Sequence, residues 1–216
     1  MRTDKLIRLS LSLLIALTAL GCGSQPVQKV VVLGFDGLTF DLLIPWAQEG
    51  KLPNFQKLME EGSATQLISS VPPSSPPAWT SAITGVNPGK HGIFGFVKGT
   101  TEVNGQPQLD FYTSRDRRAD PLWVILTEQG RRSVVVNVPC SSPPDKIRGV
   151  MISGFPHTSL TNFTSPPEYR FKIPEYRKDI YGQLVSVDGE QAFLDDMNDI
   201  MDRRAEVVMR LFEEES

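Results

Sequence analysis

Continuous runs of β-branched and other apolar residues mark the clearest elements of the chain. Residues 30–35 read VVVLGF, and residues 133–138 read SVVVNV. A run without alternating polar positions is typical of a strand that is covered on both faces, as in a parallel sheet. A third run spans residues 150–153, and residues 64–69 could form a further strand. The pattern therefore predicts a buried, parallel sheet.

Helical spacing of apolar residues is found in five segments between and after these runs: residues 38–48, 53–61, 76–84, 121–129 and 189–215. Either Pro76 or Pro77 suits the first turn of its helix, where a missing N–H costs nothing. Gly62, Gly85 and Gly130 each follow a predicted helix and are suited to end it. The alternation of strands and helices predicts an α/β fold, layered, with a mostly parallel central sheet and flanking helices.

Three stretches lack a clear period. Residues 87–92 are predicted to form a turn and loop. Residues 99–118 are polar and are predicted to be an irregular excursion over the surface or the mouth of an active site. Residues 155–187 carry many prolines and aromatic residues, which indicates a loop or a small cap.

The first residues have the pattern of an export signal. A basic start is followed by an apolar stretch over residues 9–20 and then by Gly21 and Cys22. We expect residues 1–21 to be a lipoprotein-type signal peptide, Cys22 to be lipidated, and residues 22–28 to be a linker. An ordinary cleaved signal and a retained anchor helix are the alternatives. The expected location is the periplasmic or extracellular face of a bacterial membrane, reached by export and held by the lipid.

Composition narrows the classes of partner. Removal of residues 1–21 leaves 195 of the 216 residues, which is enough for one domain with a hydrophobic core. The net charge is −3 and no basic stripe is present, so a nucleic acid polymer is not an expected partner. Only Cys22 and Cys140 are available, so we expect no disulfide framework, and Cys140 is predicted to be a small core residue.

Two polar features stand beside the apolar runs. Asp36 directly follows the first run, and a hydroxyl-bearing turn, PPSSPPAW, occupies residues 72–79. A carboxylate at a strand end and a hydroxyl at a helix N-terminus can supply one metal ligand and one nucleophile. They make only half of a phosphoryl-transfer site, since a two-metal site needs further Asp and His ligands and the chain holds only His91 and His157. Asp36 could instead cap the next helix, and Ser75 could be an N-cap.

The chain resembles the alkaline phosphatase superfamily, and more narrowly its type I phosphodiesterase and nucleotide pyrophosphatase branch. Four ordered motifs carry the resemblance: VVVLGFDG at residues 30–37, PPSSPPAW at 72–79, TGVNPGKHGI at 84–93, and NVP at 137–139 leading into ISGF at 152–155. The resemblance covers nearly all of residues 29–216, which are expected to be the N-terminal part of an alkaline-phosphatase-like domain, apparently truncated.

The resemblance implies specific roles. Asp36 would bind one of two divalent metal ions, usually zinc, and Ser75 would be both metal ligand and nucleophile in the hydrolysis of a phosphodiester or nucleotide pyrophosphate through a covalent phosphoenzyme. Ser74 and Thr80 are the competing nucleophiles. Backbone N–H groups at the start of the following helix would face the phosphate. His91 matches a loop residue that is not usually a ligand, and His157 is expected to be a surface residue.

Two departures from the family pattern affect the expected function. Some relatives have an Asn shortly after the nucleophile, where this chain has Ala78 and Trp79. The remaining Asp and His ligands of the family would lie beyond residue 216. The chain is therefore expected to be the N-terminal half of a metal-dependent phosphodiesterase and a poor enzyme alone. The alternatives are a non-catalytic lipoprotein remnant that keeps the scaffold for binding, and one chain of a split enzyme whose missing half is a separate polypeptide.

Overall fold

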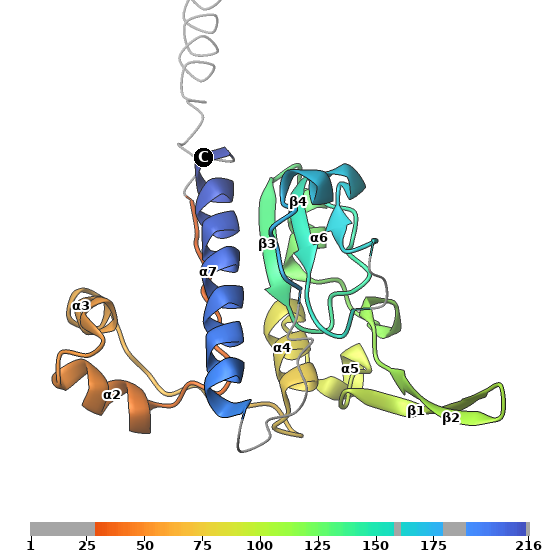
Figure 1. Cartoon of the computed structure of the whole chain (residues 1–216), viewed down its shortest axis with the longest axis horizontal. Coiled ribbons are helices and arrows are strands. Elements are labelled where there is room, and N and C mark those ends of the chain that lie inside the picture. The colour runs from red at the N-terminus through yellow and green to blue at the C-terminus, as the bar shows by residue number, and fades with distance from the viewer. Residues whose placement is uncertain (1–28, 158–160, 179–188, 215–216) are drawn as a thin grey trace, which may run out of the picture. The chain divides into compact units, whose positions relative to one another are not determined.

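The computed structural model describes residues 29–157, 161–178 and 189–214. By its internal contacts the chain divides into two units, residues 1–57 and residues 58–216. Figure 1 shows the helices and strands, coloured by their position along the chain. The predicted signal peptide, Cys22 and the whole of the predicted linker, residues 22–28, lie outside the described residues.

The first unit contains an extended segment and the helix α2 (Phe40–Gln48). Residues 29–35 are extended but unpaired, and Val30 and Val32 are 78% and 81% exposed. The predicted buried strand over residues 30–35 is therefore wrong for this structure. A β-branched run becomes a buried strand only when a neighbouring strand takes its N–H and C=O groups, and the described part of this unit holds no such strand.

Helix α3 (Pro53–Glu61) has the predicted bounds and is followed by Gly62. The next segment, residues 63–70, is also extended without pairing. Leu67 and Ile68 are each 91% exposed, so the further strand predicted over residues 64–69 is not formed.

The second unit is built on a three-stranded sheet in the order β3-β4-β5. Strands β3 (Ser133–Val138) and β4 (Gly149–Ser153) are parallel, as predicted, and the short β5 (Thr164–Ser165) is antiparallel to β4. Gly149 begins β4 with φ of 132°, and a Cβ at this position would lie 2.0 Å from the Ser133 carbonyl oxygen. Only glycine permits this close approach of the two strands.

Alternate residues of the sheet pack into two cores on opposite faces. On one face, Val150 and Ile152 join residues from three later segments: Phe163, Tyr169, Ile173, Tyr176, Val207 and Leu211. On the other face, Val135 and Met151 pack with Trp123 of helix α6 (Leu122–Glu128) and with Ile83. The predicted layered α/β fold is confirmed, although the described sheet is small.

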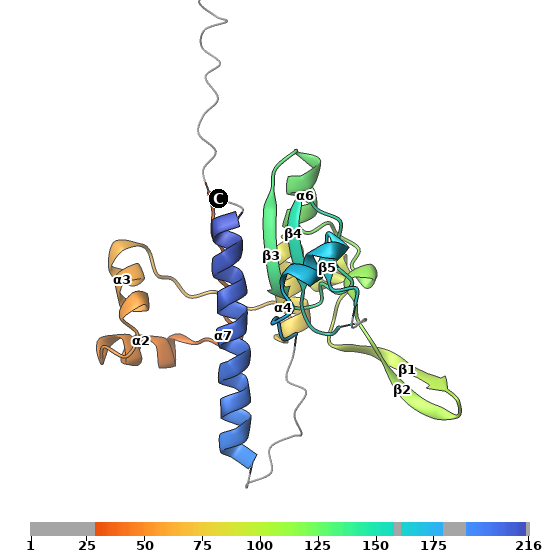
Figure 2. The ribbon, with the colours of Figure 1, turned by 45° about the horizontal axis from the view of Figure 1, so that its top comes forward.

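Helix α7 (Glu190–Glu214) agrees with the helix predicted over residues 189–215 and covers the first of these faces (Figures 1 and 2). The 3-10 helix η2 (Pro167–Lys172) and the residues after it lie against α7. Ion pairs join the two, from Arg177 to Asp196 and Asp199 and from Arg210 to Glu175. The predicted loop or cap over residues 155–187 thus contributes β5 and η2 to the packed unit.

The prediction that residues 99–118 are irregular is wrong for this structure. They belong to a hairpin of β1 (Val97–Val103) and β2 (Gln106–Phe111), followed by the short 3-10 helix η1 (Ser114–Asp116). Asn104 and Gly105 have φ of 53° and 75°, as a two-residue hairpin turn requires. Every residue of β1 is exposed. Its sequence therefore lacks the alternation of apolar and polar residues that marks a half-buried strand. The hairpin projects from the three-stranded sheet in both views (Figures 1 and 2).

Two further predictions concern single residues. Cys140 is 3% exposed and has a free thiol, so its predicted place in the core is confirmed. Burial raises the pKa of that thiol to about 11. His157 was predicted to be a surface residue, but it is half-buried, and its Nε2 lies 3.3 Å from the Lys178 carbonyl oxygen.

Candidate active site

The hydroxyl-bearing turn leads into helix α4 (Ser75–Thr84), close to the predicted bounds. Ser74 is the N-cap residue with extended φ and ψ, and Pro76 and Pro77 occupy the first turn. Gly85 ends the helix in the left-handed conformation, and its N–H donates to the Ser81 carbonyl. Proline is favoured in the first turn of a helix and glycine just after its end, and these residues therefore predict the bounds of α4 from the sequence.

The first turn of α4 offers few N–H groups to a ligand. The Ser74 N–H donates to the Pro72 carbonyl, and the Ala78 N–H donates to the Ser74 carbonyl. Pro76 and Pro77 have no N–H. Within the described residues, this leaves the Ser75 N–H as the single unbonded donor of the turn. The expectation of several N–H groups facing a phosphate is therefore wrong, although the helix dipole still favours an anion there.

The three candidate nucleophiles differ in access. Ser74 and Ser75 are half-buried, whereas Thr80 is 1% exposed on the inner side of α4. The Ser74 side chain makes no capping hydrogen bond, and no hydrogen bond of the Ser75 hydroxyl is found in the described part of the chain. The Thr80 hydroxyl cannot meet a substrate unless α4 moves, so the two serines are the accessible candidates.

Asp36 lies in the first unit, after the extended segment, and is exposed. Gly37 follows with φ of 70° and forms the turn that leads to α2. The cap of α2 is Thr39, whose Oγ1 accepts a hydrogen bond from the Asp41 N–H at 3.2 Å. Neither Asp36 nor Ser75 is the N-cap residue of a helix, so the structural roles that the sequence allowed for them are not adopted.

His91 is the member of the site region whose role the sequence did not reveal. It ends the short helix α5 (Pro88–His91), where a turn and loop were predicted, and it is completely buried. Its Nδ1 accepts a hydrogen bond from the Ile93 N–H at 3.1 Å, and its Nε2 lies 3.0 Å from the Ser81 Oγ of α4. The imidazole therefore joins α5 to the helix that begins with Ser75.

The hydrogen bonds of His91 define its protonation. Because Nδ1 is an acceptor, the proton of the neutral ring is assigned to Nε2, which donates toward Ser81. Burial lowers the pKa of His91 from its ordinary value of 6.5, and a hydrogen bond with the Pro77 backbone raises that pKa by a smaller amount. A ring that donates to Ser81 cannot also remove its proton, so the Ser81 and His91 pair is not a nucleophile with its general base.

The donors in the described residues do not form a metal centre by themselves. Across residues 29–157, 161–178 and 189–214, no three His, Cys, Asp or Glu side chains are close enough to hold one ion. A carboxylate such as Asp36 and a hydroxyl such as Ser75 are suitable oxygen donors, but a zinc site uses about three to four protein ligands.

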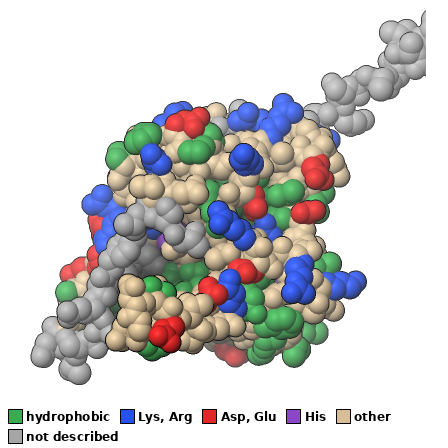
Figure 3. All heavy atoms as spheres, turned by 90° about the vertical axis from the view of Figure 1, so that its right-hand side faces the viewer, with side chains coloured by type: hydrophobic (Ala, Val, Ile, Leu, Met, Phe, Trp, Pro, Cys, Tyr) green, Lys and Arg blue, Asp and Glu red, His purple; other side chains and the backbone are tan. Residues whose placement is uncertain are grey.

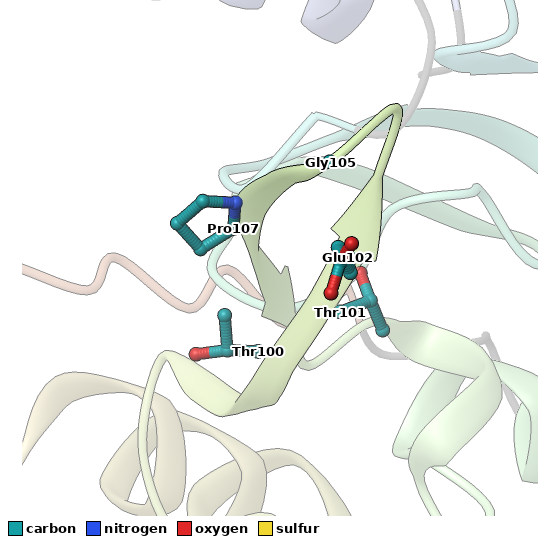
Figure 4. Close-up of a pocket in the computed structure, with 5 residues that line it drawn as sticks. All are labelled: Thr100, Thr101, Glu102, Gly105 and Pro107. Atoms are coloured by element: carbon teal, nitrogen blue, oxygen red, sulfur yellow. The ribbon is translucent and has the colours of Figure 1, made fainter.

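An open depression on the β1 and β2 hairpin is lined by Thr100, Thr101, Glu102, Gly105 and Pro107, none of which is a candidate site residue (Figure 4). Figure 3 shows Lys and Arg side chains interspersed with Asp and Glu on one face of the molecule.

Comparisons with known proteins place the chain. The family model described as type I phosphodiesterase / nucleotide pyrophosphatase matches residues 30–214. No curated protein and no solved structure matches the chain. Among the described helices, none has the length and apolar character that a membrane crossing needs.

Proposed function

As the chain belongs to the type I phosphodiesterase and nucleotide pyrophosphatase family, we propose that it carries the nucleophile of a phosphoester hydrolase. The family match is the observation that carries the proposal, and the accessible Ser75 hydroxyl at the N-terminus of α4 supports it. The substrate class is a phosphodiester or nucleotide pyrophosphate. Ser74 is the second candidate nucleophile.

The proposed reaction has two steps. The Ser75 oxygen forms a bond to phosphorus as the bond to the leaving oxygen breaks, and the leaving group receives a proton. The oxygen of a water molecule then bonds to phosphorus as the bond to the Ser75 oxygen breaks, and the Ser75 hydroxyl regains a proton. The helix dipole and the single Ser75 N–H favour negative charge at the reacting phosphate.

The family is generally metal-dependent, and we propose Asp36 and Ser75 as ligands of a divalent ion, with zinc as the expected metal. Such an ion would lower the pKa of a bound hydroxyl and stabilise charge on the phosphate. His91 is buried with both ring nitrogens engaged, so it is not available as a ligand. We propose that the further ligands come from a separate chain.

We also propose that the protein is exported and anchored by lipid at Cys22, on the basis of the sequence of residues 1–22. The membrane would then be a partner through the lipid alone. Lipid labelling that persisted in Cys22→Ala would contradict this placement.

Hydrolysis of a nitrophenyl phosphodiester tests the proposed function. We expect little turnover by the chain with zinc alone, and turnover when a polypeptide with the complementary Asp and His ligands is added. In that complemented enzyme, Ser75→Ala should lower kcat by at least about a thousandfold, as loss of a nucleophile does. Ser74→Ala is the matched control and should retain most activity.

Each contrary outcome removes one part of the proposal. Activity that survives Ser75→Ala would remove the nucleophile assignment. Efficient hydrolysis by the chain alone would remove the claim that ligands come from elsewhere. A complemented protein that binds phosphodiesters without hydrolysing them would favour the second candidate function, a non-catalytic binding lipoprotein.

A further inference from the structure

We infer that His91 is a positioning residue that fixes the first two turns of α4, and through them Ser75. The inference rests on the proposed function for the importance of Ser75. The contacts between His91 and α4 all lie within the second unit. His91 contacts α4 through Ser81, and in the described residues no hydrogen bond joins it to the Ser75 hydroxyl.

The contacts of His91 come from both sides of its ring. Ile93, which is 1% exposed, donates its N–H to Nδ1, while Nε2 reaches Ser81 on α4. The His91 carbonyl also accepts a hydrogen bond from the Arg118 N–H at 3.0 Å. The Ile93 N–H therefore holds the ring, the Arg118 N–H holds the backbone of His91, and the ring connects this fixed position to α4 through Ser81.

Helix α4 has an unusual need for such support. Its N-cap side chain makes no hydrogen bond, and two of the first three helical residues are prolines. The bond from the Ala78 N–H to the Ser74 carbonyl, at 3.0 Å, is the first backbone bond that closes the helix. A turn without a side-chain cap is easily frayed. His91 contacts the helix through Ser81, and a hydrogen bond with the Pro77 backbone raises the pKa of its ring.

The proposal requires a donor at one ring position and an acceptor at another, which two variants separate. In His91→Gln, the side-chain amide can place an N–H near the former Nε2 and so keep the bond to Ser81. In His91→Asn, the shorter side chain can keep an acceptor near the former Nδ1 but cannot reach Ser81. Ser81→Ala removes the acceptor while leaving the imidazole in place.

Amide hydrogen exchange of the full chain tests the inference without requiring activity. In His91→Asn and in Ser81→Ala, the amides of residues 78–82 should exchange about tenfold faster, because a buried hydrogen bond to α4 is lost. Amides of β3 and β4 should change much less. His91→Gln should restore most of the protection in α4. The double variant of His91→Asn and Ser81→Ala should show little more than either single change.

Three results would overturn the inference: equal loss of protection in α4 and in the sheet, unchanged exchange in α4, or failure of His91→Gln to differ from His91→Asn. Where the complemented enzyme hydrolyses a phosphodiester, His91→Asn should lower kcat and leave KM unchanged, and His91→Gln should recover kcat. A change in KM alone would also contradict positioning. Absence of hydrolysis in every variant, with the exchange pattern as expected, would count against the proposed function and not against the role of His91 in α4.

Discussion

Single residues decide what the start of α4 can do. Pro76 and Pro77 set the helix start but remove two N–H groups, so an anion there meets one donor from Ser75. This limit was present in the sequence, because proline never donates. The bond from His91 to Ser81 was not, since the two residues are ten positions apart and meet because the chain turns between α4 and α5, with Gly85 in the left-handed conformation.

His91 also makes a prediction about pH. Its pKa is lowered in the folded protein by burial, whereas in the unfolded chain it is near 6.5. The unfolded chain therefore takes up a proton first as the pH falls. The stability contributed by neutral His91 is fully present above pH 6.5 and is lost as the pH falls from there through the lower folded pKa. Urea unfolding between pH 7.5 and about 5 should show this decline in the free energy of unfolding.

The matched variants for this measurement are His91→Gln and His157→Gln. His91→Gln should be nearly independent of pH over the same interval, and His157→Gln should keep the decline. Glu175 and Asp116 do not contribute to a decline in this pH interval. Their pKa values are lowered from 4.5 and 3.8, so the stability that they contribute is lost only below those pH values. A decline that disappears in His157→Gln instead would contradict the assignment to His91.

Among the secondary structure elements, local signals were reliable where local chemistry is sufficient. Prolines and glycines marked the ends of α4, and the β-branched runs marked β3 and β4. The same kind of run at residues 30–35 predicts a buried strand that is not formed, because pairing depends on a neighbouring strand that the pattern does not contain. The β1 and β2 hairpin was not predicted, because β1 is exposed throughout and lacks an apolar face. Asn104 and Gly105 are nevertheless typical of a two-residue hairpin turn.

The role of α7 as a cover for the sheet gives a prediction on stability. Leu211 is 1% exposed and packs in the core that includes Val150 and Ile152, whereas Met209 is 61% exposed on the same helix. Leu211→Ala should lower the free energy of unfolding by about 3 kcal/mol, because it removes buried methyl groups and leaves a cavity. Met209→Ala should change it by less than about 0.5 kcal/mol. Urea denaturation measures both, and similar losses in the two variants would show that α7 does not cover the core as described.

For the whole molecule, the family match spans residues 30–214 and so includes described residues of both units. Ordered motifs allowed the family and the α/β class to be identified from sequence. The metal-ligand roles of Asp36 and Ser75 could not be predicted from local patterns, because an apolar run before Asp36 and a proline-rich turn around Ser75 do not contain the other ligands that a metal site needs. The central claim therefore depends on chemistry at Ser75.

Trapping of the covalent intermediate tests that claim most directly. The chain, with zinc and the complementary polypeptide, is mixed with a nitrophenyl phosphodiester, quenched in acid during turnover, and digested for mass spectrometry. We predict a phosphoryl adduct on Ser75, absent in Ser75→Ala and retained in Ser74→Ala. Turnover accompanied by an adduct on Ser74, or by an unmodified peptide that contains Ser75, would contradict the account.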